Sequence, residues 1–163
     1  MKILRPAVIP VLVLAATLAS AQSPAQKAFD ALKTLQGTWV GKSPAGQGAE
    51  VTYRVMSGGT IVMADQKFAD EDMTSMFYVQ GGTLWMTHYC PSNNQPRMRA
   101  TVSPDGMSVS FDFVDATNLP GPEAGHMHRA LYLFADPEHY SEDWTWKQEG
   151  KESRMHFDMQ RKK

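Results

Sequence analysis

The stretch EVTYRVMSGGTIVMADQKF, residues 50–68, decides the fold class of this chain. Val51, Tyr53 and Val55 alternate with polar residues, which is the pattern of a strand with one buried face. A glycine-containing turn at 57–59 follows, and a second strand is expected directly after it. Two such strands joined by a short glycine turn predict an antiparallel hairpin.

The same pattern continues to the C-terminus. Short turn sequences at 81–82, 104–106 and 149–150 also suit hairpins. No connection resembles the long return of a Greek key, so an up-and-down barrel is favoured over a sandwich. We therefore expect a mainly β fold, a roughly ten-stranded antiparallel up-and-down barrel. The expected strands are 37–43, 49–56, 60–68, 73–80, 83–90, 97–103, 107–115, 126–135, 138–148 and 152–161.

One helix is expected before the barrel, at 24–35. Ser23 suits the N-cap, Pro24 suits the first helical position, and Gln26 can complete a capping box. Gly37 is placed to end the helix. The helix leads into the first strand from the end of the barrel that has tight turns, so we expect it to close that end.

Alternate connections of a meander lie at the same end of the sheet, which separates a closed end from an open one. The closed end receives the tight turns 57–59, 81–82, 104–106 and 136–137. The other end, here called the mouth, receives 44–48, 69–72, 91–96, 116–125 and 149–150, most of them longer. Long loops on a rigid scaffold commonly carry binding sites. The mouth is expected to hold His88, Cys90, Arg97, Asn118, His126 and His128.

The N-terminal segment predicts export. Lys2 and Arg5 precede an apolar stretch at 7–18, and Ala19-Ser20-Ala21 is a small-residue cleavage signal. A cleaved signal peptide at 1–21 would leave a barrel domain at 22–163, without a transmembrane segment, in the periplasm or secreted.

Charge and cysteine content exclude some classes of protein. Without Lys2 and Arg5, 14 of the 16 basic residues remain against 17 acidic ones, and the only basic cluster is 161–163. This balance disfavours nucleic-acid binding. Cys90 is the single cysteine, so it cannot form a disulfide within the chain.

Two pairs of side chains suggest metal chemistry. His88 and Cys90, and likewise His126 and His128, are spaced so that each pair lies on one face of a strand. Imidazole and thiolate suit zinc, copper or iron, including haem iron. The two pairs stand on strands that are separated by about 14 Å of barrel wall. The alternative is that these residues are ordinary polar groups of the lumen.

Arg97 and Arg99 share a face just after the 91–96 loop. Guanidinium groups inside the mouth would form a clamp for a carboxylate head group. The alternative is a structural ion pair with Asp112, Asp115 or Glu142.

Methionines on most strands, and the tryptophans Trp85, Trp144 and Trp146, suit either a pliable ligand cavity or a packed core. His156 shares its face with polar residues and is expected to point outward. The ligand-binding candidates are His88, Arg97, Arg99, Asn118, His126, His128 and Trp144.

A helix followed by Gly37-Thr38-Trp39 and a ten-strand meander resembles the calycin superfamily, which includes lipocalins, fatty-acid-binding proteins and nitrobindin-like haem barrels. In these folds a basic residue covers the tryptophan, and Arg161 could do so here. We expect Trp39 to be buried near the closed end, within reach of Arg154 or Arg161. The stretches MTHYCPSNNQPRMRA (86–100), FDFVDATNL (111–119), GHMHR (125–129) and EDWTWKQEGK (142–151) resemble an uncharacterised group of exported bacterial lipocalin-like barrels. That resemblance implies the fold but no activity.

Common enzyme motifs are absent: the chain has no G-x-S-x-G, H-E-x-x-H, P-loop or C-x-x-C. The sequence therefore favours a binding protein that takes a small apolar or amphipathic molecule into its lumen, and no cofactor is expected. The alternative is a metal- or haem-dependent protein, with or without catalysis, that uses the four mouth residues His88, Cys90, His126 and His128.

Overall fold

The structure, a computed structural model, describes residues 22–163. The predicted signal peptide, 1–21, lies outside the described residues. One helix, α1, precedes ten strands, and a short 3-10 turn (Ser57–Gly59) lies between β2 and β3. The elements are α1 (Pro24–Thr34), β1 (Gly37–Lys42), β2 (Gly48–Met56), β3 (Ile61–Phe68), β4 (Glu71–Gln80), β5 (Thr83–Tyr89), β6 (Gln95–Val102), β7 (Ser108–Thr117), β8 (His126–Asp136), β9 (His139–Gln148) and β10 (Lys151–Arg161).

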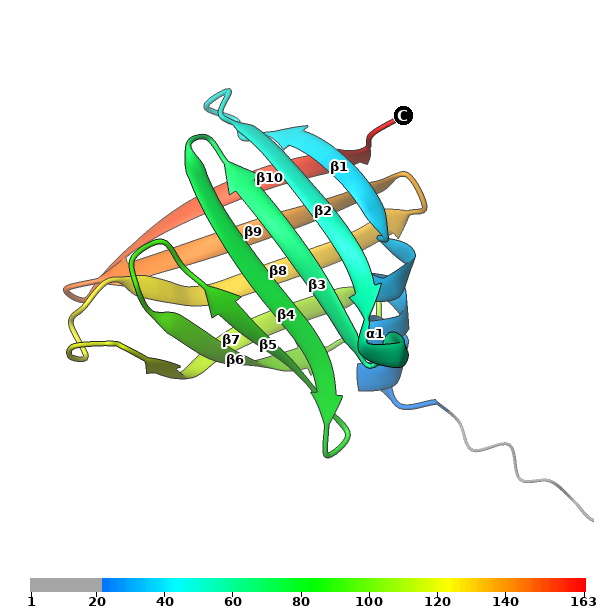
Figure 1. Cartoon of the computed structure of the whole chain (residues 1–163), viewed down its shortest axis with the longest axis horizontal. Coiled ribbons are helices and arrows are strands. Elements are labelled where there is room, and N and C mark those ends of the chain that lie inside the picture. Colours follow the sequence, from blue (N-terminus) through cyan, green and yellow to red (C-terminus); the bar gives the residue numbers. More distant parts are fainter. Residues whose placement is uncertain (1–21) are drawn as a thin grey trace, which may run out of the picture.

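The ten strands form a closed antiparallel barrel in which each strand pairs with its neighbours in sequence (Figure 1). The first and last strands close the ring, with Trp39 opposite Arg161. The expected fold class, a ten-strand up-and-down barrel with one N-terminal helix, is confirmed. Closure satisfies the hydrogen bonds that an open sheet would leave at its edges.

Helix α1 lies at the closed end of the barrel, as predicted (Figure 1). Ser23 caps the helix by accepting a hydrogen bond from the Gln26 N–H at 3.2 Å. Lys27 Nζ donates to the carbonyl of Pro104, in the tight turn between β6 and β7, at 3.3 Å. Gly106 in that turn has a φ of +81° and lies so close to α1 that a side chain there would collide with Lys27. The helix therefore seals the end that has the short turns.

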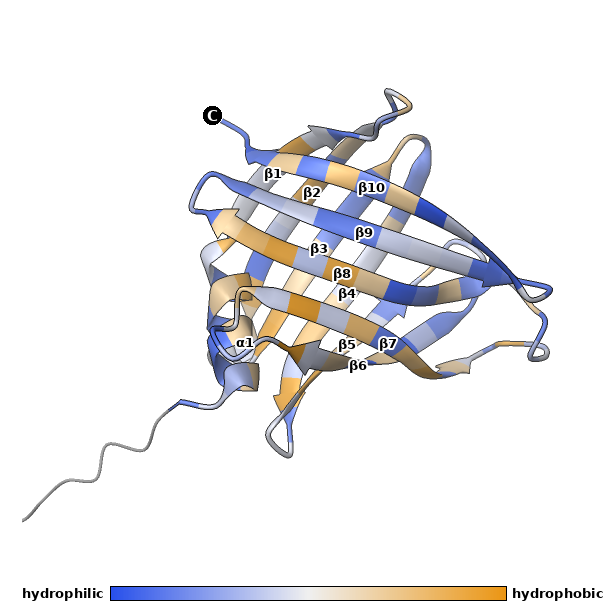
Figure 2. Cartoon of the chain, turned by 180° about the vertical axis from the view of Figure 1, so that it is seen from behind, coloured by the Kyte–Doolittle hydropathy of each residue, from blue (hydrophilic) through white to orange (hydrophobic). Residues whose placement is uncertain are grey.

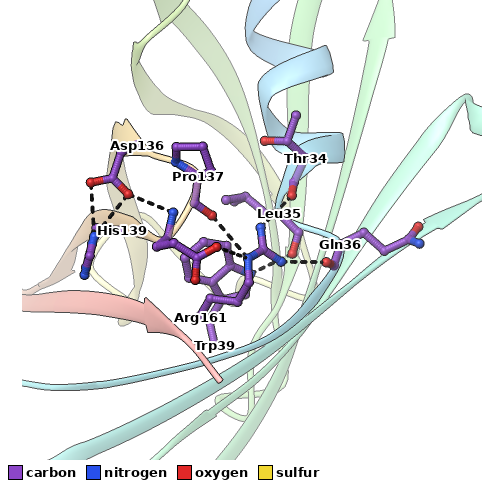
Figure 3. A network of polar contacts seen from close by, with 9 residues as sticks. Thr34, Leu35, Gln36, Trp39, Asp136, Pro137, His139 and Arg161 are labelled. Carbon is purple, nitrogen blue, oxygen red and sulfur yellow. Dashed lines mark hydrogen bonds and ion pairs between the residues drawn. The ribbon is translucent and has the colours of Figure 1, made fainter. Parts of the chain in front are cut away.

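Trp39 and Arg161 lock the helix onto the barrel (Figure 3). Trp39 is fully buried, and its Nε1 donates to the Leu35 carbonyl at 2.6 Å. The Arg161 guanidinium lies over the indole, 4.3 Å from the ring centroid, and donates to the carbonyls of Thr34, Gln36 and Pro137. The predicted cover of Trp39 by Arg161 is confirmed.

Alternation along the strands fills the closed half of the barrel with apolar side chains. Large ones besides Trp39 are Tyr53, Phe77, Phe111 and Tyr132, all with at most 1% of their surface exposed. Figure 2 shows how hydropathy changes along β8, which is hydrophobic near α1 and hydrophilic toward the other end. The interior of the closed half is thus a packed core.

The sheet is irregular near the mouth. The register between β8 and β9 shifts between Met127 and Arg129, as at a β-bulge. The ladder between β7 and β8 ends where Asp112 pairs with Arg129, so the parts of the two strands nearest the mouth are not paired with each other. Among residues 22–163, no helix has the length and apolar character of a membrane span.

Candidate ligand site at the mouth

Two adjoining pockets open at the mouth and share Glu71 and Met155. The first, about 380 Å³, lies between β3, β4 and β10, and the second, about 450 Å³, lies beside the loop after β5. Three methionines and three aromatic side chains stand in their walls beside polar and small residues. The first is lined by Gln47, Phe68, Ala69, Asp70, Glu71, Met73, Met155 and Phe157, and the second by Glu71, Cys90, Pro91, Ser92, Met127, Trp146, Ser153 and Met155.

The loops at the mouth are tied to one another. Asn94 is buried and donates from Nδ2 to the Gly125 carbonyl at 2.8 Å. Gly125 packs so tightly on Trp146 that an added Cβ would lie 2.1 Å from the ring. The Glu149 N–H donates to the Glu123 carbonyl at 3.0 Å. These contacts join the 91–96 and 116–125 loops to each other and to the end of β9, and Pro91 and Ser92 of the first loop line the second pocket.

A group of buried polar side chains, here called the polar cluster, lies inside the barrel: Gln66, Ser75, His88 and Glu142, none of which is exposed to solvent. The Ser75 hydroxyl donates to Gln66 Oε1 at 2.8 Å, and Ser75 Oγ lies 2.9 Å from His88 Nδ1. The His88 ring lies against Trp144, with centroids 4.9 Å apart, and Trp144 Nε1 donates to Glu142 Oε2 at 3.3 Å. Trp144 therefore connects the two halves of the cluster.

Burial shifts the titration of both ionisable members in the direction of their neutral forms. The pKa of Glu142 is raised to about 7, mainly by burial and against the opposing hydrogen bond from Trp144. The pKa of His88 is lowered to about 4, also by burial. At pH 7 the His88 imidazole is neutral.

Two of the residues predicted from sequence lie inside the barrel. His88 and Trp144 are fully buried and in contact with each other. Asn118 lies on the exposed rim instead, where Nδ2 donates to Gln95 Oε1 at 3.2 Å.

Arg97 and Arg99 do not lie in the mouth. Both are exposed, whereas Met98 between them is buried, so the two guanidinium groups are on the outer face. Arg97 forms a two-point ion pair with Asp115, with Nε 3.1 Å from Oδ1, and lies over Trp85. The expected carboxylate clamp is thus wrong in this position, and the structural ion-pair reading with Asp115 is the correct one.

The bulge on β8 changes which side chains reach the lumen. Strict alternation would point His126 and His128 inward together, but the extra residue places Met127 in the pocket wall instead. His126 and His128 pack on Phe113 where β7 and β8 separate, and His126 Nε2 lies 3.2 Å from His128 Nδ1. Neither histidine lines either mouth pocket.

The four expected metal ligands do not come together. Cys90 lines the second pocket and accepts a hydrogen bond from Ser92 Oγ at 2.9 Å, apart from the histidine pair. Within residues 22–163, no three or more His, Cys, Asp or Glu side chains are arranged to hold a metal ion. His156 points outward, as expected, with Nδ1 2.9 Å from Asp143 Oδ1. The alternative with haem or metal at these residues gains no support from their positions.

The sequence analysis does not predict Gln66, Ser75 or Glu142 as site residues. A signal for the first two was present, because each occupies an inward position of an otherwise apolar alternation: Gln66 between Ala64 and Phe68, and Ser75 between Met73 and Phe77. A polar residue on the buried face of a strand indicates an internal hydrogen bond or a ligand contact.

Comparison with known proteins supports the fold. No family model matches the chain, and no curated protein matches it in sequence. Among solved structures, Rv2717c from M. tuberculosis is similar with a TM-score of 0.63 and 19% identity, covering 83% of this chain and 98% of that protein. A protein of unknown function from the DUF3598 family of Nostoc punctiforme is similar with a TM-score of 0.56 and 11% identity, covering 80% of this chain and 49% of that protein. At these identities the likeness concerns the barrel fold alone.

Proposed function

We propose that this protein is a calycin-type binding barrel that takes a small apolar or amphipathic molecule through its mouth. The observation that carries the proposal is the pair of adjoining pockets lined by Phe68, Met73, Met127, Met155 and Phe157. Concave, largely apolar sites with a few polar groups are typical of small-molecule binding. Methionine side chains adapt to ligands of irregular shape.

The geometry favours binding over catalysis. The pocket walls contain one thiol, Cys90, and among the described residues its one side-chain hydrogen bond comes from Ser92. An activated thiol needs a nearby histidine or a cationic group. His88 lines neither pocket and lies deeper in the barrel, fully buried.

The test is binding of a neutral lipophilic dye, Nile red, followed by fluorescence. Met155 lies in both pockets, so Met155→Trp should fill them and weaken dye binding by about tenfold or more, corresponding to about 1.4 kcal/mol. Met107→Trp is the matched control, because Met107 is 41% exposed and lies next to the tight turn of the closed end. Dye binding that is absent, or equal in both variants, would overturn the proposal.

We also propose that the protein is exported and that residues 22–163 form the mature domain. The charged start, the apolar stretch and the small residues before Gln22 support this. N-terminal sequencing of the protein from a periplasmic fraction is expected to begin at Gln22, and a chain that begins at Met1 in the cytoplasm would contradict it.

A further inference from the structure

The polar cluster lies one layer below the pockets. Side chains two residues apart on a strand point to the same face, so a pocket-lining residue on a strand, or directly after its end, can have a deeper neighbour two positions along the chain. At four positions that neighbour belongs to the polar cluster or is the tryptophan that connects it. The pairs, pocket residue first, are Phe68 and Gln66, Met73 and Ser75, Cys90 and His88, and Trp146 and Trp144.

Several atoms in this layer have no hydrogen-bond partner among the described residues. They are Gln66 Nε2, His88 Nε2 and Glu142 Oε1. All three side chains are buried, with no exposed surface. Buried polar groups are normally satisfied, so a group of unsatisfied ones beneath a pocket indicates a place that a polar ligand atom fills.

The hydrogen bonds already present determine what these atoms offer. A serine hydroxyl has one hydrogen, and Ser75 gives it to Gln66 Oε1. The contact between Ser75 and His88 Nδ1 therefore requires Nδ1 to carry the proton and to donate. His88 Nε2 is then a bare acceptor, and Glu142 Oε1 is a second acceptor when the carboxyl group is ionised.

The charges in the lumen disfavour a ligand with a negatively charged head group. Glu142 is the only carboxylate among the buried residues of the described chain, and no lysine or arginine is buried with it. Arg97 and Arg99 are outside the barrel. An anionic head group would face Glu142 with no cation to offset the repulsion, whereas an ammonium or hydroxyl head would donate to it.

We propose that the polar cluster binds the head of the ligand, and that the ligand is an amphipathic molecule whose head donates hydrogen bonds and carries no negative charge, the chemistry of a long-chain alcohol or primary amine. The inference rests on the proposed function, because the chain of such a ligand would occupy the mouth pockets. His88 Nε2 and Glu142 Oε1 accept from the head, and Gln66 Nε2 donates to a hydroxyl head.

The experiment is displacement of bound Nile red at neutral pH by three compounds with the same ten-carbon chain: decanol, decylammonium and decanoate. Decanol and decylammonium should displace the dye at concentrations about tenfold below that of decanoate, since only decanoate places a second negative charge beside Glu142. Glu142→Gln removes the counter-charge with little change in shape. In this variant the affinity for decylammonium should fall by about tenfold relative to that for decanol, and the preference for decanol over decanoate should become smaller.

Arg97→Ala is the matched control, because this residue lies on the outer face and should change none of the three affinities. Equal displacement by decanoate and decanol in the wild type would overturn the inference and leave the proposed function standing. So would an unchanged ratio of decylammonium to decanol in Glu142→Gln, or a selective loss of decanoate in Arg97→Ala. A lack of Nile red binding would instead remove the proposed function itself.

Discussion

The indole N–H of Trp144 donates to Glu142 Oε2 at 3.3 Å, while Glu142 Oε1 has no hydrogen-bond partner in the described chain. A carboxylate has two oxygens that accept hydrogen bonds, and the single N–H of the indole satisfies only one of them. Glu142 therefore holds its proton up to a higher pH than an exposed glutamate, and its pKa is about 7. The stability of the barrel therefore depends on pH through the protonation of this buried carboxyl group.

Glu142→Gln should become more stable relative to the wild type as pH rises. The unfolded glutamate titrates near 4.5 and the folded one near 7, so between these values the native state binds the extra proton. The free energy of unfolding of the wild type therefore falls by roughly 3 kcal/mol as pH rises from 4.5 to 7, and that of the variant does not show this fall. Urea unfolding of both proteins across this range measures the difference, and a difference independent of pH would contradict the assignment.

His88→Gln should show the opposite trend. The unfolded histidine titrates near 6.5 and the folded one near 4, so in this window the unfolded state binds the extra proton. The free energy of unfolding of the wild type then falls by roughly 3 kcal/mol as pH falls from 6.5 to 4, and that of the variant does not show this fall. Because the effects of Glu142 and His88 nearly cancel between pH 4.5 and 6.5, only the single variants reveal them. The same urea series tests this, and parallel trends in both variants would contradict it.

Arg161→Ala should destabilise the protein by about 2–4 kcal/mol, because it removes the cation over Trp39 and the charged donors to three backbone carbonyls. Lys162→Ala is the control. Lys162 forms an exposed ion pair with Glu50 at 2.7 Å, which should contribute little to stability because solvent screens it. Equal losses in the two variants, measured by urea unfolding, would show that Arg161 does not hold the helix on the barrel.

Gly125→Ala should loosen the loops over the mouth. Its methyl group would collide with Trp146, so we expect a loss of about 1–3 kcal/mol in stability together with altered dye affinity. Gly121→Ala, in the same loop, is the control because nothing lies within 4 Å of the added carbon. Unfolding and dye titration of both variants make the comparison. Unchanged stability and dye affinity in Gly125→Ala would mean that Trp146 moves freely.

Zinc should not bind tightly at the mouth. The His126 and His128 pair offers two imidazoles, one of which is also 2.9 Å from the Ala124 carbonyl, whereas structural zinc takes four ligands. We expect calorimetric zinc titrations to be alike for the wild type, the double variant His126→Ala/His128→Ala, and His139→Ala. Saturable binding that only the double variant loses would restore the metal alternative.

Periodicity and turn chemistry were sufficient to predict the architecture. Alternation such as Val51, Tyr53 and Val55 and glycine turns such as 57–59 are local signals, and a meander joins strands that are neighbours in sequence. The closed end, the helix over it, and the contact of Trp39 with Arg161 followed from the order of the connections and from the calycin resemblance.

The site depended on the tertiary structure, for three physical reasons. A single extra residue in β8 breaks the two-residue period, so Met127 rather than the histidines enters the pocket wall. Arg97 and Arg99 share a face, but sequence spacing alone does not say which face is inside. The polar cluster joins β3, β4, β5 and β9, and only closure of the barrel brings Trp144 from β9 against His88 from β5. Spacing along one strand determined the barrel, whereas contact across its lumen decided which residues a ligand would meet.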